Sequence, residues 1–148
     1  NDILNMEQEF GSTDDIGTDR ETFARYYTDV VARYKKIEPH AKFFFVTMPK
    51  QSGDDEKHAE MKKRHADFLY ALSELLENCY VIDLNEYAPV YDDDFGKKYY
   101  YNGHMNPSGY MLTAEYIISG IHSIVSAYPT DFNDVAFIGT EYHYLMEN

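Results

Sequence analysis

Two short apolar runs, separated by a segment of helical character, constrain the fold of this chain most strongly. The first, residues 42–48, contains three consecutive phenylalanines and is bounded by His40 and Pro49. It is too short for a buried helix and rich in aromatic residues, which predicts a buried strand. The second run, Tyr80–Leu84, predicts a second strand.

Three segments around these runs have the apolar spacing of amphipathic helices. Thr18 followed by Glu21 matches a capping box, so the first helix is expected over about 19–37, ending before Pro39. The second is expected from about 55 to 78. The third follows Asn106, a good N-cap, and Pro107, which suits the first helical position. Residues 85–103 are expected to form a long loop, and 135–138 a small edge strand.

This order of elements is typical of an α/β domain with a parallel sheet. Two strands alone would leave a sheet edge open and the helices half uncovered. We therefore expect the second half of a larger sheet. The chain begins Asn1-Asp2-Ile3 without an initiator methionine, so we also expect it to be cut from something longer.

Charge and composition exclude several classes of partner and site. The formal net charge of −13 disfavours binding to nucleic acid or to an anionic membrane surface. No apolar run approaches the length of a membrane span. The single cysteine, Cys79, excludes an intrachain disulfide and a multi-cysteine zinc site.

The stretch Asn102–Tyr110 is the most informative for function. It places His104 just before a capped helix, in the loop after a strand, where open α/β sheets bind ligands. A histidine there can act as a general base because its pKa lies near neutrality. The alternative is a loop histidine that bonds only to the backbone.

His104-Met-Asn-Pro-Ser-Gly-Tyr110 resembles the last sequence block of the SGNH (GDSL-type) hydrolases, in which a catalytic histidine precedes a helix. Asn1-Asp2 resembles the end of that family's third block. The intervening elements fit the same order, so the resemblance covers nearly all of residues 1–148, as the C-terminal portion of a single SGNH-hydrolase-like domain. It implies a flavodoxin-like fold: a three-layer α/β arrangement with a parallel sheet flanked by helices.

The resemblance implies that His104 takes the proton from a serine hydroxyl and that the Asn1 side chain donates to the oxyanion. The intact parent would then be a serine-dependent hydrolase of a small ester or an acetylated carbohydrate, with no metal or organic cofactor. The aromatic run Tyr99, Tyr100 and Tyr101, with Asn102, would line the substrate pocket, or else only cover the edge of the core.

Two features depart from the family pattern. Tyr101 stands where the family has the aspartate of the triad, and tyrosine cannot hold an imidazolium by charge. The chain could work as a Ser–His dyad, a backbone carbonyl could orient the ring, activity could be lost, or another acid could reach the histidine. The candidate acids are Asp92, Asp93, Asp94 and Glu86.

The second departure is that no serine of the chain has a nucleophile-elbow context. This chain alone is therefore expected to be inactive, with the nucleophile in the missing N-terminal half of the domain. Either that half or a swapped copy is expected to cover the open sheet edge. The alternative function is a catalytically inactive SGNH-like domain that binds a ligand or a protein partner.

Other candidate sites receive simpler interpretations. The acidic run 92–94 lacks the spacing of an EF-hand and is expected to be a solvated loop. His58 and His65 lie seven residues apart, too far for a shared metal ion, and predict a solvated helix face. His122 is expected at or near the core.

Overall fold

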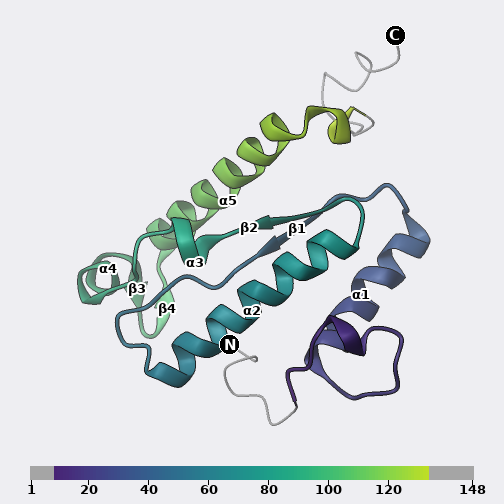
Figure 1. Ribbon diagram of the computed structural model, residues 1–148. Coiled ribbons are helices and arrows are strands. Elements are labelled where there is room, and N and C mark those ends of the chain that lie inside the picture. Colours follow the sequence, from purple (N-terminus) through teal and green to yellow (C-terminus); the bar gives the residue numbers. More distant parts are fainter. Residues whose placement is uncertain (1–8, 134–148) are drawn as a thin grey trace.

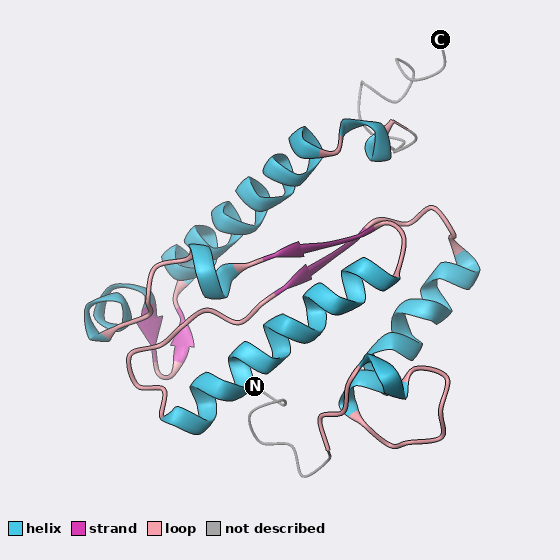
Figure 2. Ribbon diagram, viewed as in Figure 1, coloured by secondary structure: helices cyan, strands magenta, loops and turns pink. Residues whose placement is uncertain are grey.

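The structure is a computed structural model that describes residues 9–133, and it has mixed α/β architecture. Figure 2 shows that helices dominate and that the strands are few and short. In chain order the elements are η2 (Thr13–Asp15), α1 (Phe23–Ile37), β1 (Phe43–Val46), α2 (Glu56–Leu75), β2 (Cys79–Ile82), α3 (Leu84–Tyr87), α4 (Asp93–Tyr99), β3 (Tyr100–Tyr101), β4 (His104–Met105), α5 (Pro107–Ala127) and η3 (Pro129–Phe132).

The two predicted strands are confirmed, and they pair with each other. β1 and β2 run parallel, with Phe43 opposite Cys79 and Val46 opposite Ile82. The chain crosses from one strand to the other through α2, as a parallel pair requires. Helices lie on both faces of this sheet, with α1 and α2 on one side and α5 on the other (Figure 1).

The main core lies between the sheet and the helices α1 and α2. Alternate strand residues, such as Phe45 and Cys79, point into it. Leu69 and Leu72 of α2 are fully buried there, each stabilising the fold by about 2–3 kcal/mol relative to exposure. The core cluster comprises Phe10, Ala24, Val31, Phe45, Phe68, Leu69, Leu72 and Cys79.

Helix α5 approaches the other face of the sheet through a glycine. A Cβ atom at Gly120 would lie 2.7 Å from Ile82 Cγ2, so only glycine allows this approach. The helix starts as the sequence predicts, because Asn106 accepts a hydrogen bond from the Gly109 amide and Pro107 takes the first position. Gly109 is the only residue of α5 that is fully buried among the described residues.

The predicted start of the first helix is wrong. Helix α1 begins at Phe23, with Thr22 as the N-cap accepting from the Arg25 amide. The Thr18 hydroxyl instead donates to the carbonyl of Asp15, and a capping box forms earlier, between Ser12 and Asp15. Local bonds to Asp15 thus hold residues 12–22 in a compact loop.

The prediction of one long loop over residues 85–103 is also wrong. Two short helices and a hairpin form there, because aspartate side chains cap both helices. Asp83 accepts from the Glu86 amide to start α3, and Asp92 accepts from the Phe95 amide to start α4. The predicted edge strand at 135–138 lies outside the described residues.

Candidate functional site

His104 belongs to a tight β-hairpin that leads directly into α5. The turn residues Asn102 and Gly103 have φ angles of +49° and +81°, the left-handed backbone of a type I′ hairpin turn. β3 and β4 pair antiparallel across this turn, with Tyr101 opposite His104. Tyr101 therefore lies next to His104, on the same face of the hairpin.

The hairpin lies beyond the carboxyl ends of β1 and β2, the end of a parallel sheet at which ligands usually bind (Figure 1). Asn106 fixes its position. The Asn106 side-chain amide donates to the Lys98 carbonyl at 2.8 Å, and its backbone amide donates to the Tyr99 carbonyl at 2.8 Å. A Cβ atom at Gly109 would meet that Tyr99 carbonyl at 2.5 Å. The Asn-Pro-Ser-Gly segment thus joins the hairpin, α4 and α5 closely.

The three tyrosines before His104 have different environments. Tyr99 and Tyr100 are half-buried and pack against Phe95, with ring centroids 4.7 and 6.2 Å from it. Burial raises the pKa of Tyr100. Tyr101 is 74% exposed, and Asn102 at the turn is exposed too. Tyr99 and Tyr100 therefore contact a local core, whereas Tyr101 and Asn102 are open to solvent beside His104.

Three of the four candidate acids interact with groups other than His104, and the fourth is exposed. Asp92 caps α4, Asp94 forms an ion pair with Lys97 at 2.9 Å, and Glu86 forms one with Lys50 at 3.3 Å. Asp93 is exposed in the first turn of α4. Within residues 9–133, no carboxylate forms an ion pair or a hydrogen bond with His104, which is itself exposed. Asn1 lies outside the described residues.

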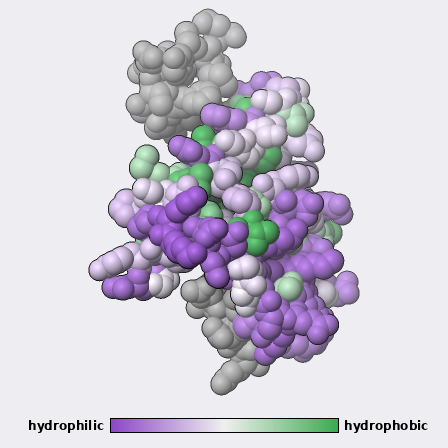
Figure 3. Space-filling view, turned by 90° about the vertical axis from the view of Figure 1, so that its left-hand side faces the viewer, coloured by the Kyte–Doolittle hydropathy of each residue, from purple (hydrophilic) through white to green (hydrophobic). Residues whose placement is uncertain are grey.

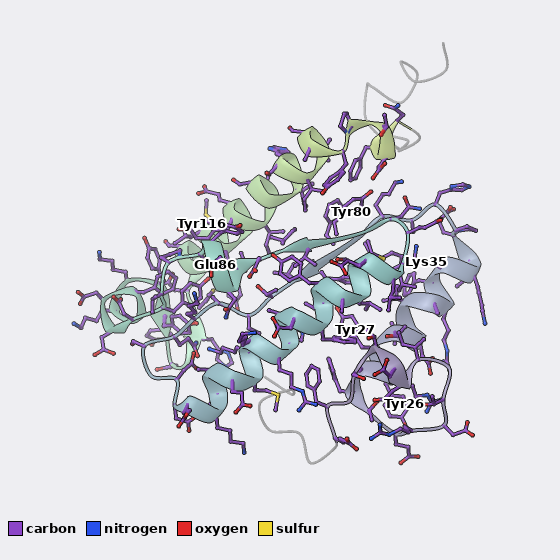
Figure 4. All side chains as sticks on the ribbon, viewed as in Figure 1. Tyr26, Tyr27, Lys35, Tyr80, Glu86 and Tyr116 are labelled. Atoms are coloured by element: carbon purple, nitrogen blue, oxygen red, sulfur yellow. The ribbon has the colours of Figure 1, made fainter. Side chains whose placement is uncertain are left out.

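Two cavities flank the carboxyl end of β2, and neither is lined by His104. An apolar groove of about 370 Å³ lies between β2, α3 and α5, with Tyr116 on its α5 wall (Figure 4). A more polar cavity of about 650 Å³ lies between α2 and the loops that follow β1 and β2. Asp83 and Tyr70 line both cavities.

Asp83 organises this end of the sheet, a role that sequence reasoning missed by placing it inside the second strand. Its carboxylate accepts from the Thr47 hydroxyl at 2.8 Å and from the Tyr70 hydroxyl at 2.9 Å. Burial, together with this bond to Asp83, raises the pKa of Tyr70 to about 12. The sequence does contain a signal for this role, an aspartate directly after an apolar strand. A residue in that position lies at the carboxyl end of the sheet, where ligands usually bind.

Two charged or titratable residues of α2 are buried. The Lys62 ammonium forms an ion pair with Asp54 at 2.6 Å and also donates to the Gln51 side chain. His65 is 5% exposed, its Nδ1 atom has no hydrogen-bond partner within residues 9–133, and burial lowers its pKa. The expected solvated face is therefore wrong for His65. The expected position of His122 near the core is wrong as well, because His122 is exposed on α5.

The face that carries the hairpin and α4 is mainly hydrophilic, with separate hydrophobic patches (Figure 3). Within residues 9–133, no group of three or more His, Cys, Asp or Glu side chains is arranged to hold a metal ion. None of the helices in that range combines the length and hydropathy of a bilayer span. Comparison with protein-family models, with curated proteins and with solved structures finds no match to this chain.

Proposed function

We propose that this chain is the C-terminal half of a three-layer, flavodoxin-like SGNH hydrolase domain, and that the intact polypeptide is a serine-dependent ester hydrolase. Its substrate would be a small ester or an acetylated carbohydrate. The observation that carries the proposal is the position of His104. It begins the second strand of a hairpin at the carboxyl side of a parallel strand pair, and the helix that follows is capped by Asn106 and starts at Pro107.

In this proposal His104 is the general base. Its imidazole takes the proton of a serine hydroxyl as the serine oxygen attacks the ester carbonyl, and the imidazolium then returns that proton to the leaving alcohol. Water hydrolyses the acyl-enzyme by the same two proton transfers. Asn1 would donate its side-chain amide to the oxyanion, a contribution of about 3–4 kcal/mol for one such donor.

Position 101, beside His104, is an exposed tyrosine and therefore supplies no carboxylate to stabilise the imidazolium. We therefore propose a Ser–His dyad rather than a complete triad. General-base catalysis is weaker without the carboxylate, but a positioned histidine still raises the rate by about 10²- to 10⁴-fold. The exposed faces of Tyr101 and Asn102 would then contact the substrate.

The missing half of the domain would supply the serine and cover the open edge of β1. The amides of Phe43 and Thr47 donate towards β2, at 2.8 and 3.1 Å from their acceptors. In a parallel ladder the backbone groups of the alternate residues, Phe44 and Val46, therefore point to the other edge. Within residues 9–133 that edge has no strand partner, so it can accept one.

The second candidate function is a catalytically inactive domain of the same fold. Tyr101 is the observation that favours it, because loss of the carboxylate from the triad is a direct route to an inactive relative. In that case the surface around the hairpin would bind a ligand or a protein without chemical change.

The test is hydrolysis of p-nitrophenyl acetate by the polypeptide that carries both this sequence and the proposed serine. His104→Gln is expected to lower kcat by about 10²- to 10⁴-fold. His122→Gln, a matched change at an exposed histidine on α5, should leave kcat unaltered. A fluorophosphonate probe should label one serine outside this sequence. Equal activity of the His104→Gln and wild-type proteins, or a lack of labelling, would exclude the hydrolase proposal.

A further inference from the structure

The outer face of α5 carries a row of apolar residues, several of which are exposed. The inner face, with Tyr116, Gly120 and Ile124, lies against the apolar groove beside β2. On the other side, apolar residues recur at alternating spacings of three and four positions. We call these residues the α5 seam: Met111, Ala114, Ile118, Ile121, Val125 and Tyr128, the last of which caps the helix.

Much of the seam is open to solvent. Met111 is 66% exposed, Ile118 50% and Tyr128 54%, whereas Ile121 and Val125 are half-buried. Apolar residues that alternate at spacings of three and four form the contact line of a coiled coil, in which a second helix covers them. A contiguous exposed apolar face of this kind marks an interaction site.

We propose that the α5 seam pairs with the α5 seam of a second copy of this chain, antiparallel about a twofold axis. The axis would cross the seam midway between Ile118 and Ile121. Ile118 of each copy would then pack against Ile121 of the other, and Ala114 against Val125. Such a contact uses the same patch on both copies, so it closes as a dimer.

A carboxylate and an imidazole beside the seam, which can form a hydrogen bond with the imidazole N–H as donor, select the second copy and its antiparallel direction. Glu115 is the one acidic residue of α5, and His122 follows it seven positions later. Both flank the seam on the same side, since each directly follows a seam residue. In an antiparallel pair, equivalent flanks lie together, so Glu115 of each copy lies beside His122 of the other. In a parallel pair they would face the opposite flank, formed by Tyr110, Ile117 and Ile124, which has no charge.

Sedimentation equilibrium of the 148-residue chain from about 1 to about 100 µM tests the contact, because this range brackets micromolar dimer affinities. We expect a monomer–dimer equilibrium. Ile118→Glu should raise the dimer Kd at least about 30-fold, as expected when a central apolar anchor is lost. Ile37→Glu, at an isoleucine that is 83% exposed at the end of α1, is the matched control and should leave Kd unchanged. A wild-type chain that stays monomeric throughout would overturn the proposal, and so would equal effects of the two substitutions.

Charge reversal tests the register with variants that alter only exposed side chains. Glu115→Arg removes the hydrogen-bond acceptor, and His122→Glu places two carboxylates together, so each single variant should weaken the dimer. The double variant pairs an arginine with a carboxylate and should recover most of the wild-type Kd. A double variant weaker than both single variants would overturn the antiparallel arrangement. Circular dichroism confirms that each variant keeps its helix content.

Discussion

Tyr101 and His104 face each other across the two-residue turn Asn102-Gly103, one on each strand of the hairpin. Side chains at such paired positions have Cβ atoms about 5 Å apart, close enough for a carboxylate at one position to bond to an imidazole at the other. The structure thus places residue 101, three positions before His104, beside the imidazole, although this residue is a tyrosine and carries no carboxylate.

This relationship predicts that Tyr101→Asp adds the missing charge to the proposed dyad. In the polypeptide that carries the serine, we expect kcat to rise about tenfold or more, since a carboxylate stabilises the imidazolium formed during acyl transfer. Tyr101→Asn has nearly the same shape without the charge and serves as the control. Ester hydrolysis at pH 7 gives the comparison, and equal rates for the two variants would show that position 101 does not act on His104.

The turn itself should be sensitive to substitution. Gly103 has φ of +81°, so a β-branched side chain there is strained, and we expect Gly103→Val to reduce the free energy of unfolding by about 1–2 kcal/mol. Gly53→Val is the matched control, because Gly53 lacks a positive φ and has open space where a Cβ would lie. Urea unfolding followed by circular dichroism measures both. A smaller loss at Gly103 than at Gly53 would contradict the type I′ geometry.

The buried ion pair on α2 predicts a large effect from removing one partner. Lys62→Ala leaves the Asp54 carboxylate, whose side chain is 12% exposed, without its cation. Loss of one partner of a buried pair costs about 3–5 kcal/mol. Lys63→Ala, next to it, removes an exposed ion pair with Asp67 and should change stability little. The double variant Lys62→Met/Asp54→Asn should recover much of the loss in urea unfolding, and failure to do so would point to packing rather than charge.

His65 predicts a specific dependence of stability on pH. Burial lowers its pKa in the folded state below the ordinary value of 6.5, so the unfolded chain binds the proton more readily. The stability associated with neutral His65 is complete above about pH 6.5 and declines as the pH falls from there through the lowered folded pKa.

His65→Phe should therefore reduce the loss of unfolding free energy between pH 7.5 and pH 5.5, measured by urea titration. Phenylalanine also suits the surroundings, where the Phe23 ring lies 6.1 Å away. His40→Phe, at an exposed histidine, is the control for the effect of introducing a phenylalanine. An identical pH dependence in wild type and His65→Phe would show that His65 is protonated equally in both states.

The elements that could be predicted from the sequence are those with a long or strong pattern. The run around Phe43–Val46, the run around Cys79–Ile82 and the three long helices all follow from apolar periodicity. The cap at Asn106 and Pro107 follows from the chemistry of helix N-termini. Each of these signals is local, so no tertiary contact is needed to read it.

The errors arose where one side chain decides the structure. Asp83 and Asp92 each create a short helix by capping it, and acidic residues in a polar segment give no periodic signal of that. The burial of Lys62 and His65 depends on how the 51–54 turn and Phe23 pack onto α2, which no spacing within α2 reveals. The position of His104 at the sheet end could be predicted. The interaction partners of Asp92, Asp94 and Glu86 could not be predicted. Asp92 accepts from a backbone amide, Asp94 pairs with a lysine of its own helix, and Glu86 pairs with a lysine from another segment.

The parallel pairing of β1 and β2 also governs the order in which this chain can fold. Each residue of β1 pairs with one that is 36 positions later, so no hydrogen bond between β1 and β2 can form before the whole intervening segment has been closed into a loop. Helix α2 occupies most of that segment, and its formation shortens the effective loop. We expect the transition state for folding to contain α2 docked through Leu69 and Leu72, with the strands joining afterwards. Substitutions in the buried face of α2 should then slow refolding, whereas those in the hairpin should mainly accelerate unfolding.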